Sequence, residues 1–225
     1  MKKLLFLVTT LVCMSWGQAY ADYSLSFDPG NTFSGTAPAG SLTAVFSDVA
    51  GGVQLVITSN LASGENLDPG KALYFNINPA DDSILSKLSF SLIGNTKFSQ
   101  ASAVSSVADN FKADGDGYYD IEFTFTSSTK AFTTGESQTY KITTSSGTIH
   151  ATDFTNYISS EGGGNGDWYA AIHVQNTPSG GSGSAWVGSN IGTLETGTPT
   201  PIPATAWLLG SGLMGLLGLR RKEKV

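Results

Sequence analysis

The sequence is poor in residues that cross-link a chain or carry charge. It has one cysteine, Cys13, and two histidines, and charged residues make up only 13% of the 225 positions. A single cysteine excludes a disulfide framework. Residues 22 to 199 contain no arginine, and their seventeen acidic residues and six lysines give a formal charge of −11. This charge argues against binding to nucleic acid or anionic lipid, and it fits a solvated exported protein or one that uses divalent cations.

The first 21 residues have the three parts of a secretory signal peptide. Lys2 and Lys3 give a positive start, an apolar core runs to Cys13, and Ala19-Tyr20-Ala21 is a small-x-small cleavage site before Asp22. The apolar core is too short for a membrane anchor. We therefore expect export through the Sec machinery and cleavage by signal peptidase after Ala21. The mature chain would begin at Asp22 and would contain no cysteine.

The C-terminal end has the pattern of a membrane anchor with a basic stop. Residues 204–219 carry no charge, and Arg220, Arg221 and Lys222 follow at once. A helix of this length spans about 24 Å, a little less than the roughly 30 Å hydrocarbon core. We expect residues 204–219 to form a transmembrane helix, the tail 220–225 to stay in the cytoplasm, and the preceding domain to lie outside.

The residues around this anchor resemble a known sorting signal. The chain reads Pro201-Ile202-Pro203-Ala204, then Trp207-Leu208-Leu209-Gly210-Ser211-Gly212-Leu213, then a glycine-spaced apolar stretch and the Arg-Arg-Lys end. This order resembles the PEP-CTERM signal, and Ile202 matches the Pro-hydrophobic-Pro variants rather than the Pro-Glu-Pro form. The resemblance implies processing by exosortase, a membrane transpeptidase-like enzyme. It also implies an inner-membrane tether followed by a cell-surface or extracellular location.

Between the two ends, apolar and polar residues alternate over short runs. Leu88, Phe90 and Leu92 alternate with polar neighbours, as do Ile121, Phe123 and Phe125. This period of two predicts half-buried antiparallel strands. Further strand signals lie at Leu73–Ile77, Tyr140–Ile142, Val53–Ile57 and Trp168–Val174, whereas Ala101–Phe111 is a candidate for a short helix. We expect an all-β fold at 22–192, an antiparallel β-sandwich with a jelly-roll order as one option, followed by a linker at 193–203.

The densest polar cluster is Asp114-Gly115-Asp116-Gly117-Tyr118-Tyr119-Asp120-Ile121-Glu122. One interpretation is a turn that leads into the strand at Ile121–Phe125. The other is a calcium loop, in which glycines let Asp114, Asp116, Asp120 and Glu122 turn toward one point. An EF-hand register fails, because Lys112 and Phe123 would fall at ligand positions that need acids. Both interpretations stay open at this stage, and calcium is the one cofactor to consider.

Two further patterns suggest sugar chemistry. Asp120 and Glu122 would project from one strand face about 7 Å apart, a separation at which paired carboxylates cleave glycosidic bonds. That chemistry needs an apolar pocket to raise the pKa of the acid, yet the shared face continues with Thr124 and Thr126. The segment 162–169 joins a glycine-rich loop to Trp168 and Tyr169, which suits sugar stacking.

The remaining aromatic and histidine residues have ordinary structural interpretations. Trp168 and Trp186 each follow a glycine-rich loop and serve equally well as core anchors. His173 lies between Ile172 and Val174, which favours an ordinary strand residue over a base or a metal ligand.

These patterns lead to a functional hypothesis with one alternative. We expect a non-enzymatic exported β protein with a structural, adhesive or glycan-contact role in extracellular polymer. Its partners would be the sorting enzyme, the membrane and an extracellular polysaccharide, with no nucleic acid among them. The alternative is a secreted carbohydrate-active enzyme that uses the acidic cluster from Asp114 to Glu122.

Overall fold

The computed structural model describes residues 21–78, 82–96, 101–114, 116–125, 132–154, 157–159, 168–178, 183–189 and 193–196. All of these except Thr196 belong to the unit Ala21–Glu195. The expected signal peptide up to residue 20, the sorting motif and the expected membrane helix lie outside these ranges. The described ranges themselves contain no helix with the length and apolar character of a membrane span.

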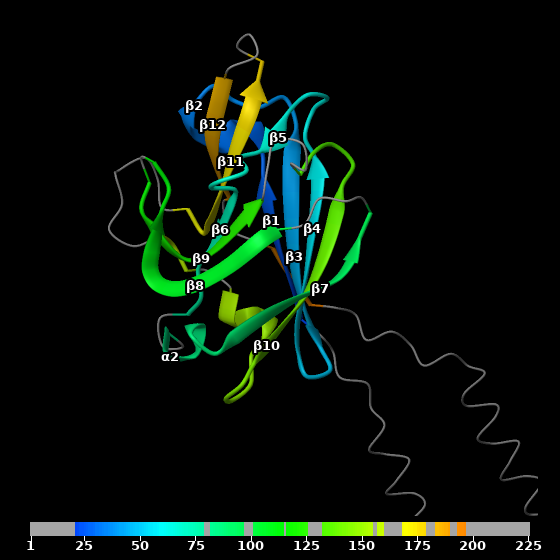
Figure 1. Cartoon of the computed structure of the whole chain (residues 1–225), viewed down its shortest axis with the longest axis vertical. Coiled ribbons are helices and arrows are strands. Elements are labelled where there is room, and N and C mark those ends of the chain that lie inside the picture. The colour runs from blue at the N-terminus through cyan, green and yellow to red at the C-terminus, as the bar shows by residue number, and fades with distance from the viewer. Residues whose placement is uncertain are drawn as a thin grey trace, which may run out of the picture. The chain divides into compact units, whose positions relative to one another are not determined.

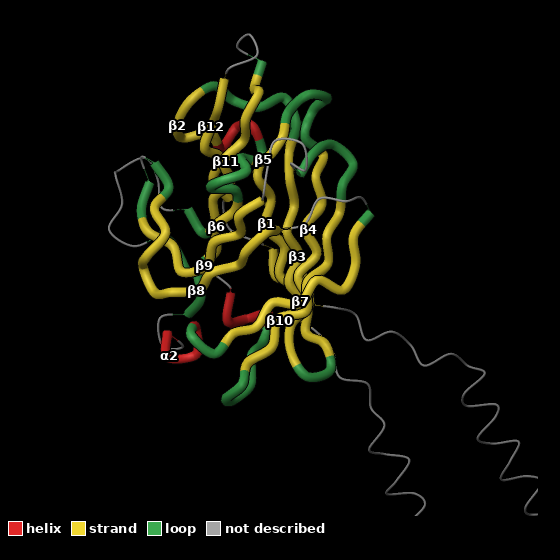
Figure 2. The backbone as a smooth tube through the Cα atoms, in the orientation of Figure 1, coloured by secondary structure: helices red, strands yellow, loops and turns green. Residues whose placement is uncertain are grey.

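Two sheets form the fold, and every strand pair with a defined register is antiparallel (Figures 1 and 2). Sheet A has the order β13 (Thr193–Thr196), β1 (Ala21–Phe27), β3 (Ser41–Val49), β4 (Gly52–Asn60), β10 (Ser137–Thr144) and β7 (Leu88–Asn95). Sheet B has the order β2 (Thr32–Gly35), β12 (Gly183–Ser189), β11 (Ala170–Thr177), β6 (Leu73–Phe75), β9 (Tyr118–Phe125) and β8 (Ala101–Lys112), with β5 (Asn66–Leu67) also paired to β11. The described helices are short: η1 (Pro29–Asn31), α2 (Asp82–Leu85) and η4 (Ala151–Phe154).

The β3–β4 hairpin shows how the sequence pattern sets the fold. Val49 pairs with Gly52, so only Ala50 and Gly51 form the turn, and Gly51 has a φ of +76°, which favours glycine. A Cβ at Gly52 would lie 2.1 Å from the carbonyl oxygen of Ile142 on β10. Glycine at this position therefore lets β10 approach the start of β4.

The inner faces of the two sheets share one hydrophobic core. The ring of Phe46 on β3 meets Phe75 on β6 edge-to-face, with centroids 5.1 Å apart. Phe123 on β9 contacts Phe90 on β7 at 5.7 Å and Tyr140 on β10 at 5.2 Å. Because strands of both sheets contribute to these contacts, the fold is a two-layer all-β structure, as the alternation of apolar residues predicts. The jelly-roll order stays a prediction.

Two sequence expectations differ from the structure. Ala101–Phe111 is not a helix, because β8 covers Ala101–Lys112 and pairs with β9. Its few apolar residues fit a helical spacing, but the pairing along β9 overrides that weak local preference. The expected linker also begins too early: β13 occupies Thr193–Thr196 next to β1 in sheet A.

Candidate functional site

Aromatic rings form a stacked row on the outer face of sheet B, the face turned away from the core. The row runs Trp168, Phe33, Trp186, Tyr74 and Tyr119, with successive centroids 6.0, 6.4, 5.3 and 5.7 Å apart and interplanar angles of 13° to 22°. Trp186, Tyr74 and Tyr119 are buried, whereas Phe33 and Trp168 at one end are half-buried. Trp186 is thus a packing residue as expected, although it packs outside the main core.

Small residues make this row fit the sheet. Ala171 on β11 lies directly opposite both Tyr74 and Gly188. Because its side chain is small, the rings of Tyr74 and Trp186 can stack beside it. A Cβ at Gly188 would stand 2.0 Å from the ring of Trp168. Glycine at this position therefore allows the indole to lie flat on the backbone of β12.

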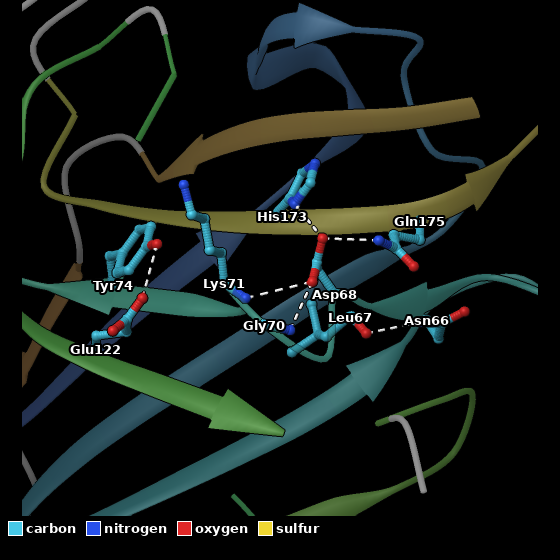
Figure 3. A network of polar contacts seen from close by, with 9 residues as sticks. All are labelled: Asn66, Leu67, Asp68, Gly70, Lys71, Tyr74, Glu122, His173 and Gln175. Atoms are coloured by element: carbon cyan, nitrogen blue, oxygen red, sulfur yellow. Dashed lines mark hydrogen bonds and ion pairs between the residues drawn. The ribbon is translucent and has the colours of Figure 1, made fainter. Parts of the chain in front are cut away.

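A polar network adjoins the ring row and is centred on Asp68, just after β5 (Figure 3). Its Oδ1 accepts hydrogen bonds from the backbone amides of Gly70 at 2.6 Å and Lys71 at 3.3 Å. Its Oδ2 accepts a hydrogen bond from Nε2 of Gln175 at 2.7 Å and lies 2.8 Å from Nδ1 of His173. One carboxylate therefore ties the loop after β5 to two side chains of β11.

His173 is held between this carboxylate and an indole. Its ring stacks on Trp186 with centroids 4.5 Å apart and 12° between the planes. Nδ1 of His173 lies close enough to Oδ2 of Asp68 for an ion pair, but the two groups are not aligned for a hydrogen bond. Nδ1 is therefore buried without a well-aligned acceptor. Burial lowers the pKa of His173, and the neighbouring Asp68 only partly offsets this effect. The imidazole is therefore mainly neutral at pH 7.

We expect His173 to make folding depend on pH. Its folded pKa is below the unfolded value of about 6.5, so under that pH the unfolded chain binds a proton that the folded chain resists. The stability is present above the unfolded pKa and is lost as the pH falls toward the folded pKa. The free energy of unfolding in urea should therefore be higher at about pH 7.5 than at about pH 5.5.

The matched control is the other histidine. His173→Gln should remove this part of the pH dependence, while His150→Gln, at a side chain that is 59% exposed, should leave it intact. A His173→Gln protein with the same slope between the two pH values as the parent would contradict the assignment.

The acidic cluster of the sequence does not converge on one point. Asp114 is exposed at the turn between β8 and β9, which the Ala113 and Gly117 backbone closes with a 3.1 Å hydrogen bond. Asp116 is fully buried and accepts a hydrogen bond from the hydroxyl of Tyr119. Glu122 accepts one from the hydroxyl of Tyr74 at 3.0 Å. The residues between β8 and β9 therefore form a turn that leads into the strand, as the first interpretation describes.

Asp120 accepts hydrogen bonds from two backbone amides of neighbouring segments. The pairing of β8 with β9 shifts between Ser106 and Phe111, where Asp109 has a φ of +49°. The two oxygens of Asp120 accept hydrogen bonds from the amides of Ile77 at 3.0 Å and Asp109 at 2.9 Å. Burial raises the pKa of Asp120, and these two amides partly oppose the rise. Asp120 and Glu122 thus have different partners, and in the described ranges no three acidic, histidine or cysteine side chains gather as metal ligands. Calcium binding by Asp114, Asp116, Asp120 and Glu122 stays a prediction.

The outer face of sheet A is a second candidate surface, which the sequence analysis did not single out. On β3 and β4 the inward positions are buried, and the outward ones stay partly accessible. The outward residues include Thr43 opposite Thr58, Val45 opposite Val56 and Ser47 opposite Gln54. The signal was present in the sequence as hydroxyl residues at alternate positions, in a chain with 52 serines and threonines.

Glu65 is a further residue that sequence reasoning missed. It is buried, and its two oxygens accept hydrogen bonds from the amides of Ala39 at 2.6 Å, Gly40 at 3.1 Å and Ala62 at 2.8 Å. It therefore joins two loops at one end of the fold. Of the expected sugar-stacking segment 162–169, residues 162–167 lie outside the described residues, whereas Trp168 and Tyr169 are described and half-buried.

Comparison of this chain with protein-family models, with curated proteins and with solved structures finds no match.

Proposed function

We propose that this chain is an exported, membrane-tethered and then released β protein with a non-enzymatic role in extracellular polymer. One observation supports the non-enzymatic role above all: three of the four carboxylates that the sequence offers for chemistry accept hydrogen bonds within the fold, and the fourth, Asp114, is exposed at a turn. Asp116, Asp120 and Glu122 each accept hydrogen bonds from their own chain. Carboxylates used in this way stabilise packed strands rather than present themselves to a substrate.

One observation favours the second candidate, a secreted carbohydrate-active enzyme. Burial raises the pKa of Asp120, as the general acid of a glycosidase requires. Yet both oxygens of Asp120 are occupied by backbone amides, whereas a general acid must reach the glycosidic oxygen. The pKa shift of Asp120 is therefore explained by its structural position, and we favour the non-enzymatic role.

The location is tested by the mass of the protein in each cell fraction. Export should leave Asp22 as the first residue, and processing near Pro201–Ala204 should remove the basic end. Both cuts are read from the intact mass of the extracellular protein. Extracellular protein that still carries Lys2, or that always retains Arg220–Val225, would contradict the sorting part of the proposal.

The absence of catalysis is tested on polysaccharides. We expect no release of reducing ends from neutral or acidic glycans by the purified protein. Release that disappears in Asp120→Asn or in Glu122→Gln, with the melting temperature retained, would establish the enzyme instead.

A further inference from the structure

The outer face of sheet A is unusual in a domain of this charge. As far as the structure describes the outward positions of β1, β3, β4, β10 and β7, only Asp22 and Lys141 are charged. Lys141 donates a hydrogen bond to the carbonyl of Ala50, which holds its ammonium near the β3–β4 turn. Residues 22–199 as a whole carry a formal charge of −11. The acids of the domain are therefore concentrated away from this face.

Across β1, β3, β4 and β10 the face is also regular, and most of its side chains are short. The registers of β1 with β3, β3 with β4 and β4 with β10 contain no shift. A row of hydroxyl residues therefore crosses four strands, Ser26, Thr43, Thr58 and Ser137. Beside it runs a row with Val45 and Val56 at its centre. Such rows lie about 7 Å apart along the strands and neighbouring strands about 4.8 Å apart.

We propose that this face binds a neutral, hydroxyl-rich polysaccharide. Each serine and threonine both donates and accepts hydrogen bonds, which matches the hydroxyl groups of a sugar. The valine row offers apolar contact for the C–H faces of the sugar rings. An acidic glycan, a nucleic acid or an anionic lipid would need basic side chains that this face lacks. The proposal rests on the proposed function, because it names the polymer component that an extracellular protein would contact.

A second copy of the chain fits the face less well. Stable interfaces between identical chains are about 65% apolar at their core. Here hydroxyl and amide residues outnumber the outward apolar residues, which are Val45, Val49, Val56 and Ile93, so two such faces would bury many polar groups against each other.

The test uses the unit Ala21–Glu195, which contains the whole described core, and insoluble polysaccharides as probes. We expect it to be depleted from solution by neutral probes (microcrystalline cellulose, chitin or curdlan) and not by alginate gel. Because this binding involves no charged groups, the bound fraction should also vary little between about 50 and 500 mM salt.

The decisive variant places a charged pair in the centre of the face. Val45→Glu with Val56→Lys leaves the net charge unchanged, and the new residues lie directly opposite each other, where opposite charges support the sheet. We expect this variant to keep its melting temperature and to bind the neutral probe at least about tenfold more weakly. The matched control is Val107→Lys, which adds a charge at an exposed position on sheet B and should bind as the parent does.

Three outcomes would overturn the inference. They are no depletion by any neutral probe, unchanged binding by the charged-pair variant, or a dimer of the parent that the charged pair converts to a monomer. The last would assign the face to a second copy. These outcomes leave the proposed function standing if the exported masses are correct and no glycan is cleaved. Wrong masses or glycan cleavage would remove the proposed function whatever the binding result.

Discussion

Phe123→Ala should lower the free energy of unfolding by about 3–5 kcal/mol, the range expected when a fully buried phenylalanine is truncated. The ring is fully buried and contacts Phe75 at 5.8 Å as well as Phe90 and Tyr140. It therefore joins rings of both sheets. Truncation removes the buried area and leaves a cavity between two rigid layers that close only partly.

Urea denaturation of the unit Ala21–Glu195 measures this effect. Val107→Ala is the matched control, because Val107 is 50% exposed on β8 and its truncation should change stability by no more than about 0.5 kcal/mol. A loss below about 1 kcal/mol for Phe123→Ala would mean that its ring does not lie between the sheets.

Glu65→Ala should cost about 3–5 kcal/mol, although the residue is polar. Its carboxylate accepts hydrogen bonds from Ala39, Gly40 and Ala62. Hydrogen bonds to a charged group are each worth about 1.5–3 kcal/mol, and a buried amide left without an acceptor costs about 1–3 kcal/mol. The expected loss is smaller than the sum of these contributions over three amides, because water can enter the space that the side chain leaves and bond to them.

Glu65→Gln keeps the size of the side chain but replaces one of its two acceptor oxygens by an NH2 group. Glutamine keeps one carbonyl oxygen, so we expect an intermediate loss. Asp28→Ala, at an exposed carboxylate that accepts a hydrogen bond only from Ser26 among the described contacts, should be nearly neutral. Equal stability of the Glu65→Ala and Asp28→Ala proteins in urea would show that Glu65 does not join the two loops.

The alternation of apolar and polar residues predicts the strands of this fold better than it predicts their arrangement in the sheets. The inward positions of β9 and β10 follow directly from Ile121, Phe123, Tyr140 and Ile142, because a strand with one buried face must alternate. The insertion of β10 between β4 and β7 is set by packing between distant segments, which no local pattern encodes. The strand β8 was missed because its alternating pattern is weak and its pairing with β9 decides its conformation.

The candidate site was less predictable than the fold for the same reason. The sequence places four acids within nine residues, and their proximity suggested a common target. In the folded chain each acid is directed by a partner from elsewhere, such as Tyr74 for Glu122 and Ile77 for Asp120. The contact of Asp68 with His173 joins two residues that neither spacing nor motif connects.

The strand order of sheet B has a consequence for the time course of folding. The β3–β4 hairpin is joined by two residues and can close early, but β11 at Ala170–Thr177 must find β5 and β6 about a hundred residues earlier in the chain. Closing such a loop costs chain entropy before its contacts compensate, and sheets built this way typically fold in milliseconds to seconds. During synthesis, Leu73 and Phe75 on β6 therefore lack their neighbour on β11 until almost the whole unit has emerged.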